Sequence, residues 1–218
     1  MPRPKPVEKP EKDRLHLLLL GGSQGIGATT YNYLVSSGHV VYTAQGTPPI
    51  RSLDDTYDRG FFYFIDYLEP STAVGLVQKF VEAEVKLDGL VFCDEYGDPQ
   101  PKFLWNAFDY KDAFLQNVIG VSQLIIYLEK HEVLKYAVPT ILTTETRKIG
   151  SEYLPFGAAR AAMPAYLEYI SKTYPLESEL LFIPRPTDTD DLSWDAYTEA
   201  VLKTFESGHT GMGRTISY

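Results

Sequence analysis

In Leu17-Leu18-Leu19-Leu20-Gly21-Gly22-Ser23-Gln24-Gly25-Ile26-Gly27, spaced glycines directly follow a short apolar run, and this stretch is the strongest indication of the fold. Residues 15–20 predict a buried strand, and residues 26–37 have the apolar spacing of a helix. Gly21 permits a tight turn, Gly25 lets the backbone approach a pyrophosphate, and Gly27 lets the helix pack close to the strand. Free N–H groups at the helix start would face the anion. We therefore predict a nucleotide-binding turn, with a turn that binds no ligand as the alternative.

Outward from this stretch, short apolar runs alternate with segments of helical period. Because apolar strands separated by helices belong in a parallel sheet covered on both faces, the sequence predicts an α/β fold. We expect a Rossmann-like doubly wound parallel sheet of about seven strands with helices on both faces, and a ligand crevice beyond the carboxyl ends of the strands. The predicted strands are residues 15–20, 40–44, 61–65, 89–93, 139–144, 179–183 and 214–218, and the predicted helices are 26–37, 72–86, 110–130, 156–173 and 194–206.

The 218 residues fit a single domain over residues 15–218, because no polar linker divides the middle of the chain. Residues 1–14 hold four prolines among alternating charges and are expected to form a flexible N-terminal arm. The formal charge of −9 argues against nucleic acid as a partner, and no apolar run approaches the roughly 20 residues of a membrane span. With Cys93 as its only cysteine, nothing marks an oxidising compartment, and we expect a cytoplasmic protein.

Residues 21–27, Gly-Gly-Ser-Gln-Gly-Ile-Gly, resemble the glycine motif of the short-chain dehydrogenase/reductase family, with Leu20 where the family usually has threonine. Other motifs similar to the family's follow in the family's order. They are Asp66 after the third strand, Leu-Asp-Gly-Leu-Val at 87–91, Asn-Val-Ile-Gly at 117–120, Pro-Arg-Pro-Thr-Asp-Thr at 184–189 and Thr-Gly at 210–211. The resemblance covers roughly residues 15–218, and its specificity lies in the ordered set.

The resemblance implies an NAD or NADP cofactor whose type stays open. Neither the acid that selects NAD nor the arginine that accepts the 2′-phosphate of NADP follows the second strand, which ends in Ala44-Gln45-Gly46. The family's aspartate contacts the adenine and its threonine holds the nicotinamide carboxamide, which implies these roles for Asp66 and Thr189. Asp94 and Glu95 would lie near the adenosine half, where negative charge is unfavourable unless it is aimed at a ribose. The implied cofactor-binding positions are Gly21, Ser23, Gln24, Gly25, Ile26, Gly27, Asp66, Arg160 and Thr189.

The sequence departs from the family at the catalytic residues. Where the family has Tyr-x-x-x-Lys, this chain has Phe156-Gly157-Ala158-Ala159-Arg160. In the family the tyrosine exchanges the substrate proton as hydride moves, and the lysine lowers its pKa and binds the ribose. Phe156 has no hydroxyl, whereas Arg160 keeps donors for ribose oxygens. The positions matching the family's site are Asn117 for its helical asparagine, Thr143 or Thr144 for its serine, Phe156 and Arg160.

Three functions stay open from the sequence. The first is a dinucleotide-binding protein of oxidoreductase lineage that is catalytically impaired, a pseudoenzyme. The second is an active NAD(P)-dependent oxidoreductase acting on a small carbonyl or alcohol, with Tyr153, a threonine hydroxyl or a water near Asn117 as the proton donor. The third is a structural subunit that binds no cofactor. The family resemblance implies a dimer, or another homo-oligomer or protein partner, under all three, and the four scattered histidines predict no metal site.

Overall fold

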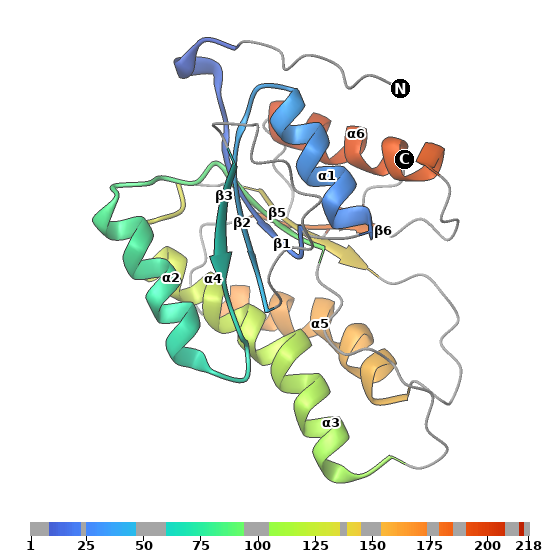
Figure 1. Ribbon diagram of the computed structural model, residues 1–218. Helices are drawn as coiled ribbons and strands as arrows, with labels where there is room; N and C mark the ends of the chain where they lie inside the picture. The colour runs from blue at the N-terminus through green and yellow to red at the C-terminus, as the bar shows by residue number, and fades with distance from the viewer. Residues whose placement is uncertain are drawn as a thin grey trace.

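The computed structural model describes residues 9–22, 25–46, 60–93, 105–135, 139–144, 154–173, 179–184, 191–207 and 214–215. Within these described residues, seven parallel strands form one sheet in the order β3-β2-β1-β4-β5-β6-β7. They are β1 (His16–Leu20), β2 (Val40–Gln45), β3 (Gly60–Phe64), β4 (Gly89–Phe92), β5 (Pro139–Thr144), β6 (Glu179–Pro184) and β7 (Arg214–Thr215). The expected Rossmann-like parallel sheet of about seven strands is confirmed (Figure 1).

Helices cover both faces of this sheet, as expected. Helices α1 and α6 pack on one face, and α2, α4 and α5 pack on the other (Figure 1). The helices are α1 (Gly25–Ser36), α2 (Pro70–Glu82), α3 (Ala107–Phe114), α4 (Gly120–Lys130), α5 (Leu154–Thr173) and α6 (Asp191–Ser207). The single helix predicted over residues 110–130 is instead α3 and α4 joined by a π-helical turn, η2 (Leu115–Ile119).

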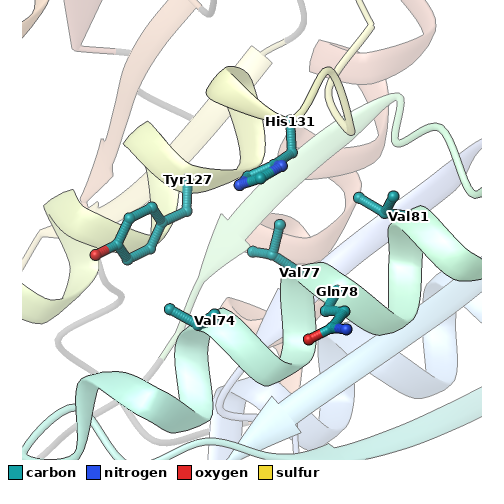
Figure 2. A pocket seen from close by; sticks show the side chains of 6 residues that line it. All are labelled: Val74, Val77, Gln78, Val81, Tyr127 and His131. Carbon is teal, nitrogen blue, oxygen red and sulfur yellow. The ribbon is translucent and has the colours of Figure 1, made fainter.

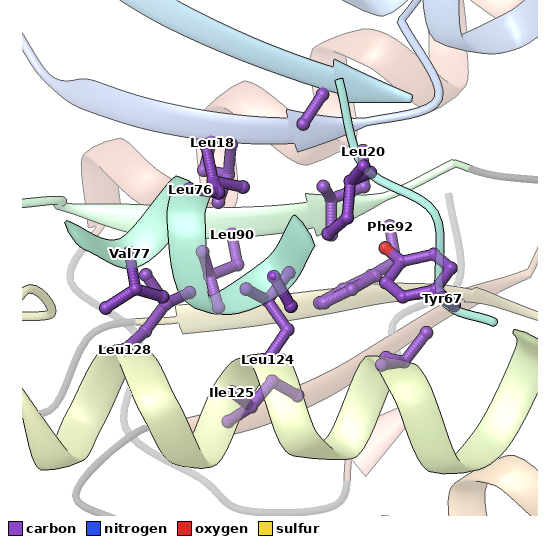
Figure 3. Close-up of a cluster of buried hydrophobic side chains, with 14 of the residues drawn as sticks. Leu18, Leu20, Tyr67, Leu76, Val77, Leu90, Phe92, Leu124, Ile125 and Leu128 are labelled. Carbon is purple, nitrogen blue, oxygen red and sulfur yellow. The ribbon is translucent and has the colours of Figure 1, made fainter. Parts of the chain in front are cut away.

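The four leucines of β1 show why the sheet needs helices on both faces. Leu17 and Leu19 belong to the apolar layer beneath α1 and α6, whereas Leu18 and Leu20 belong to the layer beneath α2 and α4 (Figure 3). All four side chains are 0% exposed. Since burying one leucine contributes about 1.5–3 kcal/mol, this central strand anchors both layers of the core.

The position of α6 makes one crossover unusual. The chain steps in opposite directions along the sheet from β1 to β2 and from β6 to β7, yet α1 and α6 lie on the same face. These two crossovers therefore have opposite hands, and the β6 connection is the one that differs, since β1-α1-β2 and β4-α4-β5 share the usual hand. As a result α6 lies beside α1, where Tyr197 Oη is 3.8 Å from Cys93 Sγ at the end of β4.

Residues 9–14, the second part of the segment expected to be a flexible arm over residues 1–14, are among the described residues. Residues Glu11–Asp13 form a short 3₁₀ turn, η1, and Arg14 Nε donates to the Lys9 carbonyl oxygen at 2.9 Å. Lys9 Nζ lies 3.0 Å from Nε2 of buried His39, whose Nδ1 accepts a hydrogen bond from the Leu15 N–H at 3.1 Å. This segment therefore packs against the start of β2, while residues 1–8 lie outside the described residues.

Candidate nucleotide-binding site

The turn between β1 and α1 accepts only glycine at two positions. Gly21 has a φ of 88°, which L side chains rarely adopt. A Cβ on Gly27 would overlap the carbonyl oxygen of Gly21, so the helix can approach the turn this closely only without a side chain there. The turn is bonded to both neighbouring strands, because Gly21 N–H donates to the Ala44 oxygen at 3.1 Å and Cys93 N–H donates to the Leu20 oxygen at 2.8 Å. The tight turn and the close packing expected of these glycines are present, and their contact with a cofactor stays a prediction.

The start of α1 offers backbone donors and positive potential. Gly25 is the first residue of the helix, and the first helical turn holds no acidic residue. The side chain of Ile26 is only 2% exposed and packs in the apolar layer, so its backbone N–H is the group it offers to a ligand. The first N–H groups of a helix lack intrahelical partners and suit a phosphate. Ser23 and Gln24 lie outside the described residues.

Asp66 follows β3 at the same edge of the sheet and is held in a rigid turn. Its Oδ1 accepts from the Leu68 N–H at 2.9 Å, the Asx-turn pattern. The Thr72 hydroxyl donates to the Asp66 carbonyl oxygen at 2.8 Å and accepts from its N–H at 2.9 Å. Backbone and carboxylate of this half-buried residue are thus oriented before any ligand arrives.

Asn117 lies inside the π-turn η2 and is 3% exposed. Its Nδ2 donates to the Ala113 carbonyl oxygen at 2.9 Å, and the N–H of Gly120 closes the turn on the Leu115 oxygen five residues earlier. Such π-turns occur frequently at functional sites. The π-turn could not be predicted from residues 115–119, Leu-Gln-Asn-Val-Ile, because each of these residues is compatible with an α-helix.

The remaining positions of the predicted catalytic site lie on β5 and α5. Thr143 and Thr144 are the last residues of β5, where they pair with Ile183 and Pro184 of β6. Phe156 is half-buried in the first turn of α5, and position 160 follows one helical turn later on the same side. The structure describes the backbone at Thr143, Thr144 and Arg160 and not their side chains. Because α5 packs against η2, the turn with Asn117 and the helix with Phe156 are neighbours.

The parallel sheet therefore gathers most of the predicted positions at one edge. The glycine turn follows β1, Asp66 follows β3 and the threonines end β5, and the carboxyl ends of parallel strands share an edge. Predicted or surrogate positions that lie outside the described residues are Ser23, Gln24, Asp94, Glu95, Tyr153 and Thr189. Sequence reasoning overlooked Tyr67, which is buried next to Asp66 and packs against α4.

A cavity of about 350 Å³ lies elsewhere, in the groove between α2 and α4 (Figure 2). Three of its six lining residues are valines, Val74, Val77 and Val81, and the other three are Gln78, Tyr127 and His131. None of the predicted site residues lines it. We place the candidate site at the carboxyl edge of the sheet, because the donors and the fixed carboxylate are there and the groove offers mainly apolar surface.

Burial shifts the pKa of titrating groups on three neighbouring strands, His16 in β1, Tyr42 in β2 and Tyr63 in β3. Burial lowers the pKa of His16 at the start of β1 and raises the pKa of Tyr42 in β2, and His16 Nδ1 lies 3.0 Å from Tyr42 Oη. Among the described residues, no cluster of three or more His, Cys, Asp or Glu side chains is arranged to hold a metal ion. In the same part of the chain, no helix is long and apolar enough to cross a membrane.

Comparison with known proteins defines the fold class more closely. No family model and no curated protein matches the sequence. Among solved structures, a short-chain dehydrogenase from Mycobacterium smegmatis has a TM-score of 0.74 and 14% identity over 98% of this chain and 96% of that chain. A short-chain dehydrogenase/reductase from Saccharomyces cerevisiae has a TM-score of 0.73 and 17% identity over 94% and 96%.

A third neighbour is the RhlG/NADP active-site complex of Pseudomonas aeruginosa, with a TM-score of 0.73 and 16% identity over 94% of each chain. These likenesses place the chain among α/β proteins with a doubly wound parallel sheet. Within that class, the chain has the fold of the short-chain dehydrogenases/reductases over nearly its whole length. The resemblance first noted in the motifs is confirmed for the fold.

Proposed function

We propose that this chain is a divergent member of the short-chain dehydrogenase/reductase family that binds NAD or NADP and is impaired in catalysis. The observation that carries the proposal is the contact between Gly27 and Gly21, which brings α1 so close to the end of β1 that only glycine fits. This close approach directs the donors at the helix start toward the place of a pyrophosphate. The NADP-bound neighbour supports the cofactor class.

The turn at Asp66 supports the same cofactor. With Oδ1 held by the Leu68 N–H, the carboxylate has a set orientation and can accept from an adenine amino group at little entropic cost. Asp66 would thus receive the adenine, the start of α1 the pyrophosphate, and Arg160 a ribose. These roles follow the order of the strands along the sheet.

Impaired catalysis follows from Phe156. A phenyl ring neither donates nor accepts the proton that must accompany hydride transfer to a carbonyl. Arg160 retains donors for the cofactor, so binding can persist where turnover is lost.

A ligand titration tests the binding proposal. NADH and NADPH are added separately to the full chain up to millimolar levels, and the melting temperature should rise with concentration for at least one of them. Asp66→Asn keeps the Oδ1 acceptor of the turn and removes the charge, so we expect about tenfold weaker affinity, about 1.4 kcal/mol, without loss of fold. No shift with either nucleotide would contradict the proposal and favour the structural subunit.

A restored site tests the impairment. The parent chain should be silent in carbonyl reduction with either nucleotide, and Phe156→Tyr with Arg160→Lys should create measurable turnover. Phe156→Leu with Arg160→Lys is the matched control, because it changes both positions without supplying a hydroxyl. Robust turnover by the parent would show that the protein is not impaired.

A working oxidoreductase is the second candidate, and the π-turn favours it. Asn117 is buried within η2 beside α5, an arrangement suited to holding a proton-relay water. Tyr153, three residues before Phe156, would then be the first residue to test as the acid. In a parent with activity, an unchanged rate in Tyr153→Phe would exclude this tyrosine as the donor.

A further inference from the structure

Tyr67 is the central residue of the Asp66 turn and points inward. It is 3% exposed, whereas its neighbour Leu68 is 40% exposed. Its ring belongs to the apolar layer between the sheet and α4, near Phe92 of β4 (Figure 3). The turn that holds the Asp66 carboxylate therefore also inserts a large side chain into the core.

Tyr67 meets α4 at a glycine. A Cβ on Gly120 would lie 2.5 Å from Tyr67 Cβ and 2.9 Å from both Cγ and Cδ1. Because Cβ is fixed by the backbone, a larger residue at position 120 could be accommodated only by moving the helix away from the turn. Gly120 is also the residue whose N–H closes the π-turn on Leu115.

We propose that Tyr67 is a positioning residue that ties the Asp66 turn to the π-turn carrying Asn117. The bonds from Thr72 hold the Asp66 turn, Tyr67 packs on Gly120, and Gly120 closes the turn around Asn117. The adenine side of the site and the side that faces α5 then move as one unit. The role toward a ligand rests on the proposed function; the contact itself does not.

A tyrosine that merely fills the core predicts something different. Disturbing it would lower the free energy of unfolding and raise hydrogen exchange throughout the apolar layer. A positioning contact predicts that disturbing it speeds hydrogen exchange at residues 115–120 in particular. This increase should exceed the one caused by a substitution elsewhere that lowers the free energy of unfolding by the same amount. Hydrogen exchange measured residue by residue therefore distinguishes a core-filling role of Tyr67 from a positioning role.

The test is hydrogen exchange of the full chain without ligand. Gly120→Ala should speed exchange of residues 115–120 several-fold beyond a Phe80→Leu control, which disturbs the same layer beneath α2. Tyr67→Phe keeps the ring on Gly120 and should retain the parent's exchange rates there. Equal exchange at 115–120 in Gly120→Ala and Phe80→Leu, or an effect as large in Tyr67→Phe, would overturn the proposal.

The second arm adds NADH or NADPH at saturation. In the parent, binding should slow exchange both at residues 66–68 and at 115–120. In Gly120→Ala, the ligand should still protect 66–68 while protection of 115–120 is reduced. Binding that protects 66–68 alone in the parent overturns the coupling. Absence of binding by both nucleotides overturns the proposed function, and the first arm still decides whether Tyr67 holds the π-turn.

Discussion

Two glycines in helices show how differently a missing side chain can act. Gly27 in α1 has the carbonyl of Gly21 where its Cβ would be, so the close approach of helix and turn depends on it. Gly75 in α2 has no atom within 4 Å of that place, so nothing in the chain requires a glycine there. Glycine is therefore required at position 27 of α1, whereas at position 75 of α2 it only lowers the stability of the helix.

Alanine substitutions should therefore have opposite effects at these positions. Gly27→Ala must separate α1 from β1 and should cost on the order of 4 kcal/mol or more, because a backbone carbonyl cannot move aside. Gly75→Ala should stabilise by about 0.5–1 kcal/mol through helix propensity. Urea unfolding of both variants measures these changes in the free energy of unfolding. A parent-like midpoint for Gly27→Ala would show that the turn is looser than the contact implies.

Among the helix ends that the structure describes, three share one hydrogen-bond pattern. In α1, α2 and α4, the two residues after the last turn donate back to it in the Schellman arrangement, with φ of 90° at Gly38, 53° at Glu84 and 54° at Glu132. Helix α1 ends in the favoured glycine. Helices α2 and α4 force a glutamate into the left-handed region and carry that strain.

Replacing these glutamates should stabilise the protein. Glu84→Gly and Glu132→Gly relieve about 1 kcal/mol of strain each, and the greater entropy of unfolded glycine offsets part of it, which leaves a gain of about 0.5 kcal/mol. Gly38→Ala is the opposite control and should destabilise by a similar or larger amount. Thermal unfolding of the three variants is the measurement. Destabilisation by both glycine substitutions would mean that the glutamates make compensating contacts.

The π-turn η2 marks the limit of prediction at the scale of elements. The apolar spacing of residues 110–130 correctly indicates helix, and α3 and α4 occupy that range. The extra residue in η2 has no local signature, and the closest contact at its end, between Gly120 and Tyr67, joins positions more than fifty residues apart. Contacts distant in sequence override propensity there.

At the scale of the whole molecule, the two ends of the sheet have different characters. The carboxyl end carries the glycine turn, Asp66 and η2. The amino end holds a partly exposed cluster in which the backbone N–H of His16 donates to Asp88 Oδ2 at 2.9 Å and Lys135 pairs with the same carboxylate. These contacts at the amino end of the sheet link β1, β2 and β4 and so contribute to the stability of the whole fold.

This amino end should make folding depend on pH. Burial lowers the pKa of folded His16, although Asp88 opposes the shift, so the unfolded chain binds the proton more readily. The stability from neutral His16 is present above its ordinary pKa of about 6.5 and is lost as pH falls through that value toward the lowered one. Urea unfolding between pH 8 and pH 5 should show a smaller decline in His16→Asn than in the parent. If the free energy of unfolding falls equally with pH in both proteins, His16 is excluded as a source of the pH dependence.

The sheet, its helical layers and the place of the glycine turn could all be predicted from the amino-acid sequence. Those features follow from local patterns: apolar runs of strand length, helical periods between them, and glycines at the junction. Three-dimensional packing sets the path of α6 across the sheet, the contact of residues 9–14 with His39, and the contact of Tyr67 with Gly120 next to the turn around Asn117. These three features depend on packing between surfaces whose residues lie far apart in the sequence. Such packing produces no periodic pattern in the amino-acid sequence.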